Sequence, residues 1–179
     1  MSRKFIPVLM LVFLVACGPQ SREIPAAPSA GSGTGFVLAS SDFSDNGRIP
    51  GGLTCDAGNG SPALNWSGAP SGTKSFILTL RDPDAPGGDF LHWAVADIPP
   101  SVSGVGQNDK FPPGSRALKN SADVFGYTGP CPPSGTHRYI FSLYATDAAN
   151  FGGEAAQLEN FLKAHTLADM PALLNQYSV

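Results

Sequence analysis

Two short stretches of the sequence gather residue types that can do chemistry. The first, RDPDAPGGDFLHW at 81–93, holds three aspartates and a histidine among two prolines and two glycines. The second, GPCPPSGTHRY at 129–139, holds a further histidine and a tyrosine. Carboxylates and imidazoles at this density can bind a metal, perform acid–base chemistry, line a pocket for an anion, or only shape a turn.

Strand geometry predicts which of these side chains meet. Asp82 and Asp84 follow the predicted strand 75–81, and His92 lies near the start of the next strand. A hairpin-like connection would therefore bring the three close together. In the second stretch the histidine and the tyrosine are two residues apart, so on a strand they point to the same face. Prolines favour extended geometry in the preceding residue, and such a stiff turn suits a preformed binding site.

The elements that must position these residues are mainly strands. SFILTLR at 75–81, FLHWAVADI at 90–98 and RYIFSLYA at 138–145 are apolar and rich in β-forming residues, and turns rich in Gly and Pro separate them. Residues 154–165 have the three-and-four spacing of a helix. The final stretch, LADMPALLNQYSV, is ambiguous because its proline argues against one continuous helix. The sequence predicts a mainly β fold with one or two helices near the C-terminus.

Composition and charge exclude one class of partner. The 179 residues contain 21 Gly and 17 Pro, which favours many turns, and they suffice for one domain with a core. The net charge is −3, and no cluster of Lys and Arg is present. We therefore expect no nucleic-acid binding, since that function leaves a basic footprint.

The first 17 residues, MSRKFIPVLMLVFLVAC, predict export. They have a basic start, an apolar run and a small-residue end, which is the pattern of a secretory signal peptide. Leu14-Val15-Ala16-Cys17 resembles the bacterial lipobox, which implies cleavage before Cys17, attachment of a diacylglyceryl group to it, and acylation of the new amine. Several acyl chains anchor a protein firmly. An ordinary signal peptide with a chance cysteine is the alternative.

The predicted organisation follows from this leader. Residues 1–16 are the signal peptide, and residues 17–33 are the lipid-bearing cysteine and a flexible tether of Pro, Ala, Ser and Gly. Residues 34–179 are the folded domain. We expect an exported lipoprotein anchored in a membrane. If the source is Gram-negative, Gly18 in place of Asp favours the outer membrane, facing the periplasm.

Several motifs together resemble the phosphatidylethanolamine-binding protein family, in its bacterial Raf-kinase-inhibitor-like branch. The matching stretches are CDAGNGSPALNW at 55–66, GAPSGTKSF at 68–76, DPDAP at 82–86, HW at 92–93 and GPCPPSGTHRY at 129–139. The resemblance implies a large central antiparallel sheet, a second smaller sheet, and short peripheral and C-terminal helices. The C-terminal NQYSV departs from the family's usual Gly-x-Tyr-x-Arg-like ending. The resemblance therefore does not predict whether this segment contributes to the rim of the pocket.

The resemblance also implies a small surface pocket for anions such as phosphate and phosphate-bearing headgroups. It places this pocket at Asp82, Asp84, Pro86, His92, Gly129, Pro130, His137 and Tyr139, with Trp66 and Trp93 as neighbours. The implied function is binding of a small anionic or phosphorylated ligand without turnover. The alternative is a protease- or kinase-inhibitor-like protein that acts on a protein partner through the pocket face, and a hydrolase is less favoured. We expect no cofactor, catalytic residue or metal, since the sequence contains neither a metal-ligand cluster nor a nucleophile elbow.

Two carboxylates repel an anion, so an anion-binding pocket at this position needs positive charge that offsets them. Protonation of His92 and His137 is one source, and backbone N–H groups of the Gly129-Pro130 loop are another. A proton shared between the carboxylates is a third. For Asp82 a second interpretation stays open, because an aspartate at this position can shape the turn without touching a ligand.

Three further residues are interpreted as lying outside the pocket. Asp89 is interpreted as a solvated loop residue, and His165 on the predicted helix as structural. Arg138 alternates with His137 on the strand, so we expect it to pair elsewhere.

The cysteines predict one disulfide. With Cys17 assigned to the lipid, Cys55 and Cys131 remain as an even pair in an exported protein. The bridge would stabilise the fold by roughly 4 kcal/mol through loop closure. Two reduced thiols are the alternative.

Overall fold

The computed structural model describes residues 35–178, apart from the side chains of residues 171–174. The predicted signal peptide 1–16 and the predicted lipid-bearing tether 17–33 lie outside the described residues. Within the described part of the chain, no helix has the length and apolar character that crossing a membrane requires.

Two antiparallel sheets form the domain, which confirms the predicted mainly β fold. The smaller sheet has the order β1 (Val37–Ser40), β2 (Leu64–Ser67) and β5 (Gly104–Val105). The larger sheet has the order β6 (Arg116–Ala117), β4 (Phe90–Ile98), β3 (Ser75–Asp82), β7 (Thr136–Thr146) and β8 (Thr166–Ser178). A short 3-10 helix, Gly51–Leu53, lies between β1 and β2.

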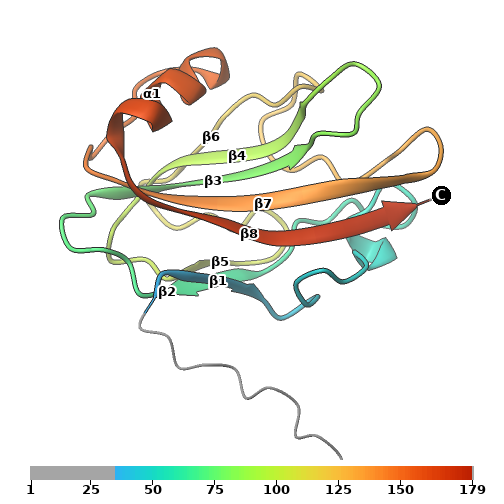
Figure 1. The fold of residues 1–179 in the computed structure, drawn as a ribbon, viewed down its shortest axis with the longest axis horizontal. Coiled ribbons are helices and arrows are strands. Elements are labelled where there is room, and N and C mark those ends of the chain that lie inside the picture. Colours follow the sequence, from blue (N-terminus) through green and yellow to red (C-terminus); the bar gives the residue numbers. More distant parts are fainter. Residues whose placement is uncertain (1–34, 179) are drawn as a thin grey trace, which may run out of the picture. The chain divides into compact units, whose positions relative to one another are not determined.

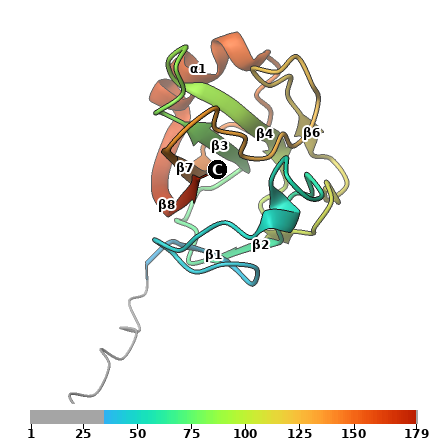
Figure 2. The ribbon, with the colours of Figure 1, turned by 90° about the vertical axis from the view of Figure 1, so that its right-hand side faces the viewer.

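The central strands of the large sheet are apolar because both of their faces are covered. Along β3 the side chains alternate: Leu78 and Leu80 join the larger core cluster, whereas Ile77 joins a second cluster with Leu158 and Leu162. The larger cluster includes residues of β1 and β2, and the second includes helix residues. The views in Figures 1 and 2 place the small sheet and the helix on opposite sides of the large sheet. Burial on two faces explains a continuous apolar run where a surface strand would alternate.

The predicted helix forms, preceded by a tighter turn. Residues Ala155–Gln157 form a 3-10 turn, and α1 spans Leu158–His165. Glu154 and Gln157 form a reciprocal capping box at the start of the turn. Such a box satisfies backbone N–H groups that a helix start leaves without partners.

The ambiguous tail is a strand, β8, at the edge of the large sheet. An edge strand tolerates Pro171, because one side of it makes no continuous ladder. A register shift between Phe141 and Ser142 of β7 falls opposite this proline. The end of β8 nevertheless gains a partner, since the N–H of Ile49 donates to the carbonyl of Gln176 at 3.1 Å.

The antiparallel order brings functional segments to one end of the large sheet. β3 ends at Asp82, whose partner across the sheet is Phe90 at the start of β4. On the other side of β3, Arg81 pairs with Ile140 near the start of β7. The two sequence stretches that hold the acids and histidines therefore lie next to each other.

Candidate binding pocket

A cavity of about 230 Å³ opens at this end of the sheet. Its lining combines four polar side chains with a larger number of apolar ones. The lining residues are Asp82, Ala85, Pro86, Phe90, His92, Thr128, Gly129, Cys131, Pro132, Pro133 and His137. Both sequence stretches contribute to it, as the sequence predicts.

Asp82 and His137 form a buried pair in the cavity. Their side chains are 4% and 9% exposed, and Asp82 Oδ2 lies 2.7 Å from His137 Nδ1. The second carboxylate oxygen accepts the backbone N–H of Asp84 at 2.9 Å. Asp82 therefore does two things: it shapes the turn, as its second interpretation proposed, and it also lines the cavity.

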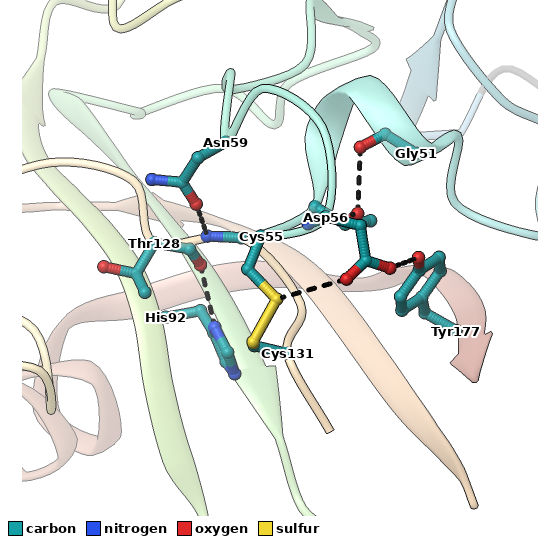
Figure 3. The surroundings of a disulfide bond; sticks show 10 residues. Gly51, Cys55, Asp56, Asn59, His92, Thr128, Cys131 and Tyr177 are labelled. Carbon is teal, nitrogen blue, oxygen red and sulfur yellow. Dashed lines mark hydrogen bonds between the residues drawn. A yellow bond between two sulfur atoms is a disulfide. The ribbon is translucent and has the colours of Figure 1, made fainter. Parts of the chain in front are cut away.

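His92 reaches the cavity from β4 and is held from behind by the backbone of Thr128. Its Nδ1 lies 2.8 Å from the Thr128 carbonyl oxygen, and the Thr128 N–H donates to the His92 carbonyl at 3.0 Å. Figure 3 shows the ring with one nitrogen at this contact and the other turned away from it. Burial lowers the pKa of His92, and the hydrogen bond to Thr128 opposes this only in part. The ring therefore favours the neutral form in the folded protein.

Tyr139 lies behind the two histidines and is fully buried. Its ring centroid is 5.4 Å from that of His92 and 6.5 Å from that of His137. Burial, followed by the negative charge of Asp82, raises the pKa of the Tyr139 hydroxyl. Tyr139 thus remains neutral and packs the histidines, but it does not itself line the cavity.

The Gly129-Pro130 segment differs from the prediction, since Gly129 lines the cavity and Pro130 does not. The Gly129 N–H donates to Asn59 Oδ1 at 2.6 Å, so it does not point at a ligand, and the proline has no N–H. The carbonyl of Pro130 accepts the Cys55 N–H at 3.1 Å. The prediction that these backbone groups supply positive charge is therefore wrong. Gly129 is required for another reason: a Cβ there would lie 2.6 Å from the Leu53 carbonyl oxygen.

The predicted disulfide is present and lies beside this segment. Cys55 and Cys131 are bridged, with their Cα atoms 5.5 Å apart, and Cys131 lines the cavity (Figure 3). Figure 3 also shows Asp56, beside the bridge, in a hydrogen bond with the Tyr177 hydroxyl. The atypical C-terminal strand is thereby fastened to the loop that carries Cys55.

Asp84 differs from its prediction, because it lies outside the cavity lining. Its carboxylate faces Arg138, with Oδ1 2.6 Å from Nη2 and Oδ2 2.8 Å from Nε, and Oδ2 also accepts the Arg138 N–H at 2.9 Å. The Arg138 guanidinium holds the pKa of Asp84 well below its usual range. The expectation that Arg138 pairs away from the pocket is confirmed, and its partner is the aspartate assigned to the pocket.

The two tryptophans also lie elsewhere, since both belong to the larger core cluster. Trp66 packs edge-on to Phe76, with ring centroids 5.5 Å apart. Trp93 is fully buried against Tyr127, also with centroids 5.5 Å apart. A register shift in β4 between Leu91 and Trp93 interrupts strict alternation here, and Trp93 joins the larger core cluster whereas Leu91 joins the second one.

His165 and Asp89 lie outside the cavity lining, as the sequence predicts, and each pairs with a charged side chain. His165 Nδ1 lies 2.9 Å from Asp147 Oδ1 on the surface. Asp89 is half exposed and pairs with Arg81 at 2.5 Å. Among the described residues, no three His, Cys, Asp or Glu side chains are grouped as a metal ion would need.

Sequence reasoning missed several residues that matter here. Phe90 lines the cavity beside His92, with ring centroids 4.7 Å apart, and the two-residue spacing on β4 carried that signal. Thr128 had no comparable signal. Neither did Asn120, a buried amide whose Nδ2 donates to the His92 carbonyl at 3.0 Å and to Thr128 Oγ1 at 2.8 Å.

Comparison with known proteins gives consistent results. Residues 39–177 match the sequence profile described as "Phosphatidylethanolamine-binding protein". A UPF0098 protein of Methanothermobacter thermautotrophicus is 44% identical over 126 residues, which cover 68% of this chain and 83% of the relative. The "Putative lipoprotein LppC" of Mycobacterium tuberculosis is 38% identical over 128 residues, which cover 70% of this chain and 63% of LppC. The crystal structure of Escherichia coli YbcL, titled a new member of the mammalian PEBP family, superposes with a TM-score of 0.75 at 31% identity, covering 80% of this chain and 98% of YbcL.

Proposed function

We propose, starting from the fact that this chain belongs to the phosphatidylethanolamine-binding protein family, that its cavity binds a small phosphorylated ligand without turnover. The supporting observation is the placement of His92 and His137. Both line one cavity, and each uses Nδ1 to contact the protein. Among the described residues, neither Nε2 atom has a hydrogen-bond partner, so both are available to a ligand.

The charge of the cavity can accommodate an anion once His137 is protonated. The imidazolium then offsets the charge of Asp82, and the outer pair Asp84–Arg138 is neutral in sum. A phosphoryl group that approaches His137 Nε2 therefore meets a hydrogen-bond donor rather than a bare carboxylate.

The apolar walls restrict what the ligand carries next to its phosphoryl group. Beside the polar group of Asp82, His92 and His137, the cavity is lined by an alanine, a phenylalanine and three prolines. A ligand whose phosphoryl group bears a short carbon chain would bury apolar surface there, which free phosphate cannot do. Phosphoethanolamine and other alkyl phosphomonoesters share this chemistry.

The side chains of the lining support binding rather than hydrolysis. Cys131 is in the disulfide and offers no thiolate. Thr128 Oγ1 accepts a hydrogen bond from Asn120, and among the described residues no hydrogen bond joins it to a histidine ring. The lining therefore offers no hydroxyl or thiol paired with a histidine, which is the arrangement that activates a serine, threonine or cysteine nucleophile.

The lipid anchor belongs to the same proposal. Its support is the lipobox-like ending of the leader at Cys17 and the name of the relative LppC as a putative lipoprotein. The domain would then be exported and held at a membrane by acyl chains, with no electrostatic help because its net charge is negative.

Native mass spectrometry of the full chain extracted from its own membrane tests both parts. We expect the mass of a chain that begins at an acylated Cys17, and we expect added methyl phosphate to bind the wild type but not His137→Gln. An unacylated chain would refute the anchor. Equal binding by the two proteins would refute the pocket, and a stoichiometric protein partner lost in His137→Gln would favour the inhibitor alternative.

A further inference from the structure

The two pocket histidines are not equivalent, because their Nδ1 atoms contact different kinds of acceptor. His92 faces the backbone carbonyl of Thr128, whereas His137 faces the carboxylate of Asp82. A carbonyl is uncharged, and a carboxylate carries a full charge that matches an imidazolium. This difference decides what each Nε2 can offer to a ligand.

At His92 the contact settles the tautomer of the neutral ring. A carbonyl oxygen only accepts hydrogen bonds, so Nδ1 must carry the hydrogen. The neutral ring then has a lone pair, and no hydrogen, on Nε2. His92 is 6% exposed, and its burial lowers the pKa, which keeps the ring neutral in the folded protein. His92 therefore presents a hydrogen-bond acceptor to the cavity.

The position of His92 is fixed by a closed hydrogen-bond network. Asn120 Nδ2 donates to the His92 carbonyl at 3.0 Å and to Thr128 Oγ1 at 2.8 Å. Asn120 Oδ1 accepts the N–H groups of Ala122 at 2.9 Å and Val124 at 3.1 Å. These bonds hold the backbone of His92 and the Thr128 segment in place. Exchange of the two ring nitrogens would break the Nδ1 hydrogen bond to the Thr128 carbonyl, so the acceptor on Nε2 is built into the fold.

His137 offers a hydrogen-bond donor at Nε2 when an anion is bound, whereas His92 offers an acceptor. The Nδ1–H of His137 donates to Asp82, and an anion at Nε2 would place the ring between two negative groups. The imidazolium form, with a hydrogen on both nitrogens, satisfies both. His137 therefore presents a charged donor to the same cavity in which His92 presents an acceptor.

The other ionisable groups near His92 do not reverse this assignment. Asp82 on β3 is engaged by His137, and the hydroxyl of Tyr139 on β7 keeps its proton because burial raises its pKa. The carboxylate of Asp84 is turned to Arg138 outside the cavity lining. No second cation from the described residues lines the cavity with His137.

Building on the proposed function, we infer that the pocket selects a phosphomonoester in its monoanionic form and discriminates against phosphodiesters. The monoanion has one P–OH, which donates to His92 Nε2, and anionic oxygens, one of which accepts from His137 Nε2. A diester has anionic oxygens but no P–OH, so it covers the His92 acceptor without giving it a hydrogen-bond donor. Sites built around one hydrogen bond strongly reject a ligand that lacks the matching group.

Calorimetric titration of the full chain in detergent micelles, with methyl phosphate and dimethyl phosphate as probes, tests this inference. At about pH 6 we expect methyl phosphate to bind about tenfold or more tightly than dimethyl phosphate. Raising the pH to about 8 should weaken methyl phosphate roughly tenfold or more, because a phosphomonoester loses its second proton near pH 6. Equal affinity of the two esters would overturn the inference and leave the proposed function standing. Failure of both esters to bind would overturn both.

His92→Gln separates hydrogen bonding from the larger size of the diester. The glutamine amide can donate as well as accept, so we expect the affinity ratio of the two esters to fall to within about threefold. His165→Gln is the matched control, since His165 pairs with Asp147 outside the cavity, and its ratio should equal that of the wild type. An unchanged ratio in His92→Gln would attribute the discrimination to size and overturn the inference. Imidazole nitrogen-15 spectra of the wild type give a readout that needs no variant: a hydrogen on His92 Nε2 at neutral pH would also overturn it.

Discussion

Two acid–base pairs join the same turn to the same strand at similar distances, yet they differ in burial and in their relation to the cavity. Asp82–His137 is buried and lines the cavity, with 2.7 Å between its atoms. Asp84–Arg138 is a similar 2.6 Å in length, but it is largely exposed and lies outside the cavity lining. Each residue of the inner pair is one or two positions from its counterpart in the outer pair. A single step along β7 therefore separates a candidate ligand contact from a surface ion pair.

Strand alternation and solvent explain the difference. His137 and Arg138 are neighbours on β7, so they must point to opposite faces. Water and salt screen the outer pair, which fastens the turn and contributes little more. The inner pair lacks this screening, so removal of one partner leaves a buried polar group uncompensated. Similar distances therefore do not imply similar function.

Asp82→Asn compared with Asp84→Asn should give the largest contrast. Asparagine at 82 cannot provide the charge that stabilises the His137 imidazolium. We expect the affinity for methyl phosphate to fall about tenfold or more, since hydrogen bonds to charged groups contribute about 1.5–3 kcal/mol. Asp84→Asn should change the affinity by less than about twofold. Calorimetry measures both, and an equal loss in the two variants would show that the outer pair also serves the ligand.

A smaller contrast concerns stability, because His92 in the cavity and Asp84 in the outer pair affect the free energy of unfolding in different pH ranges. Because burial lowers the folded-state pKa of His92, its contribution is fully present above the unfolded value of about 6.5 and is lost as the pH falls below it. Asp84 behaves differently, since its contribution is present above the unfolded value of about 3.9 and is lost only at lower pH. Urea unfolding at about pH 5 and pH 7.5 should show a smaller pH-dependent loss of stability in His92→Gln than in the wild type. Asp84→Asn should keep the wild-type difference, and a changed difference there would contradict the assignment.

Local patterns predicted much of the fold and part of the site. The apolar runs at 75–81 and 90–98 predicted the strands that became β3 and β4, and two-residue spacing placed His137 and Tyr139 on one face. Cysteine counting predicted the bridge between Cys55 and Cys131. These features depend on short-range geometry, so sequence alone could reach them.

Features that depend on distant segments were not predictable in this way. The ambiguity of residues 167–179 was resolved only by pairing with β7, which makes this stretch a strand in spite of its proline. The sequence placed Asp84 in the pocket, because nothing in the DPDAP motif indicates that its carboxylate forms an ion pair with the distant Arg138. The amide of Asn120 reaches His92 across 28 residues, so no local spacing could reveal it.

The central claim is that His92 and His137 contact a phosphoryl ligand through Nε2, and imidazole nitrogen-15 NMR of the full chain tests it most directly. On addition of methyl phosphate we expect the Nε2 resonances of His92 and His137 to shift, while those of His165 stay in place because that ring pairs with Asp147 on the surface. Saturable shifts confined to the two pocket rings would support the account. Shifts at His165 alone, or no shift at either pocket ring when methyl phosphate is bound, would contradict it.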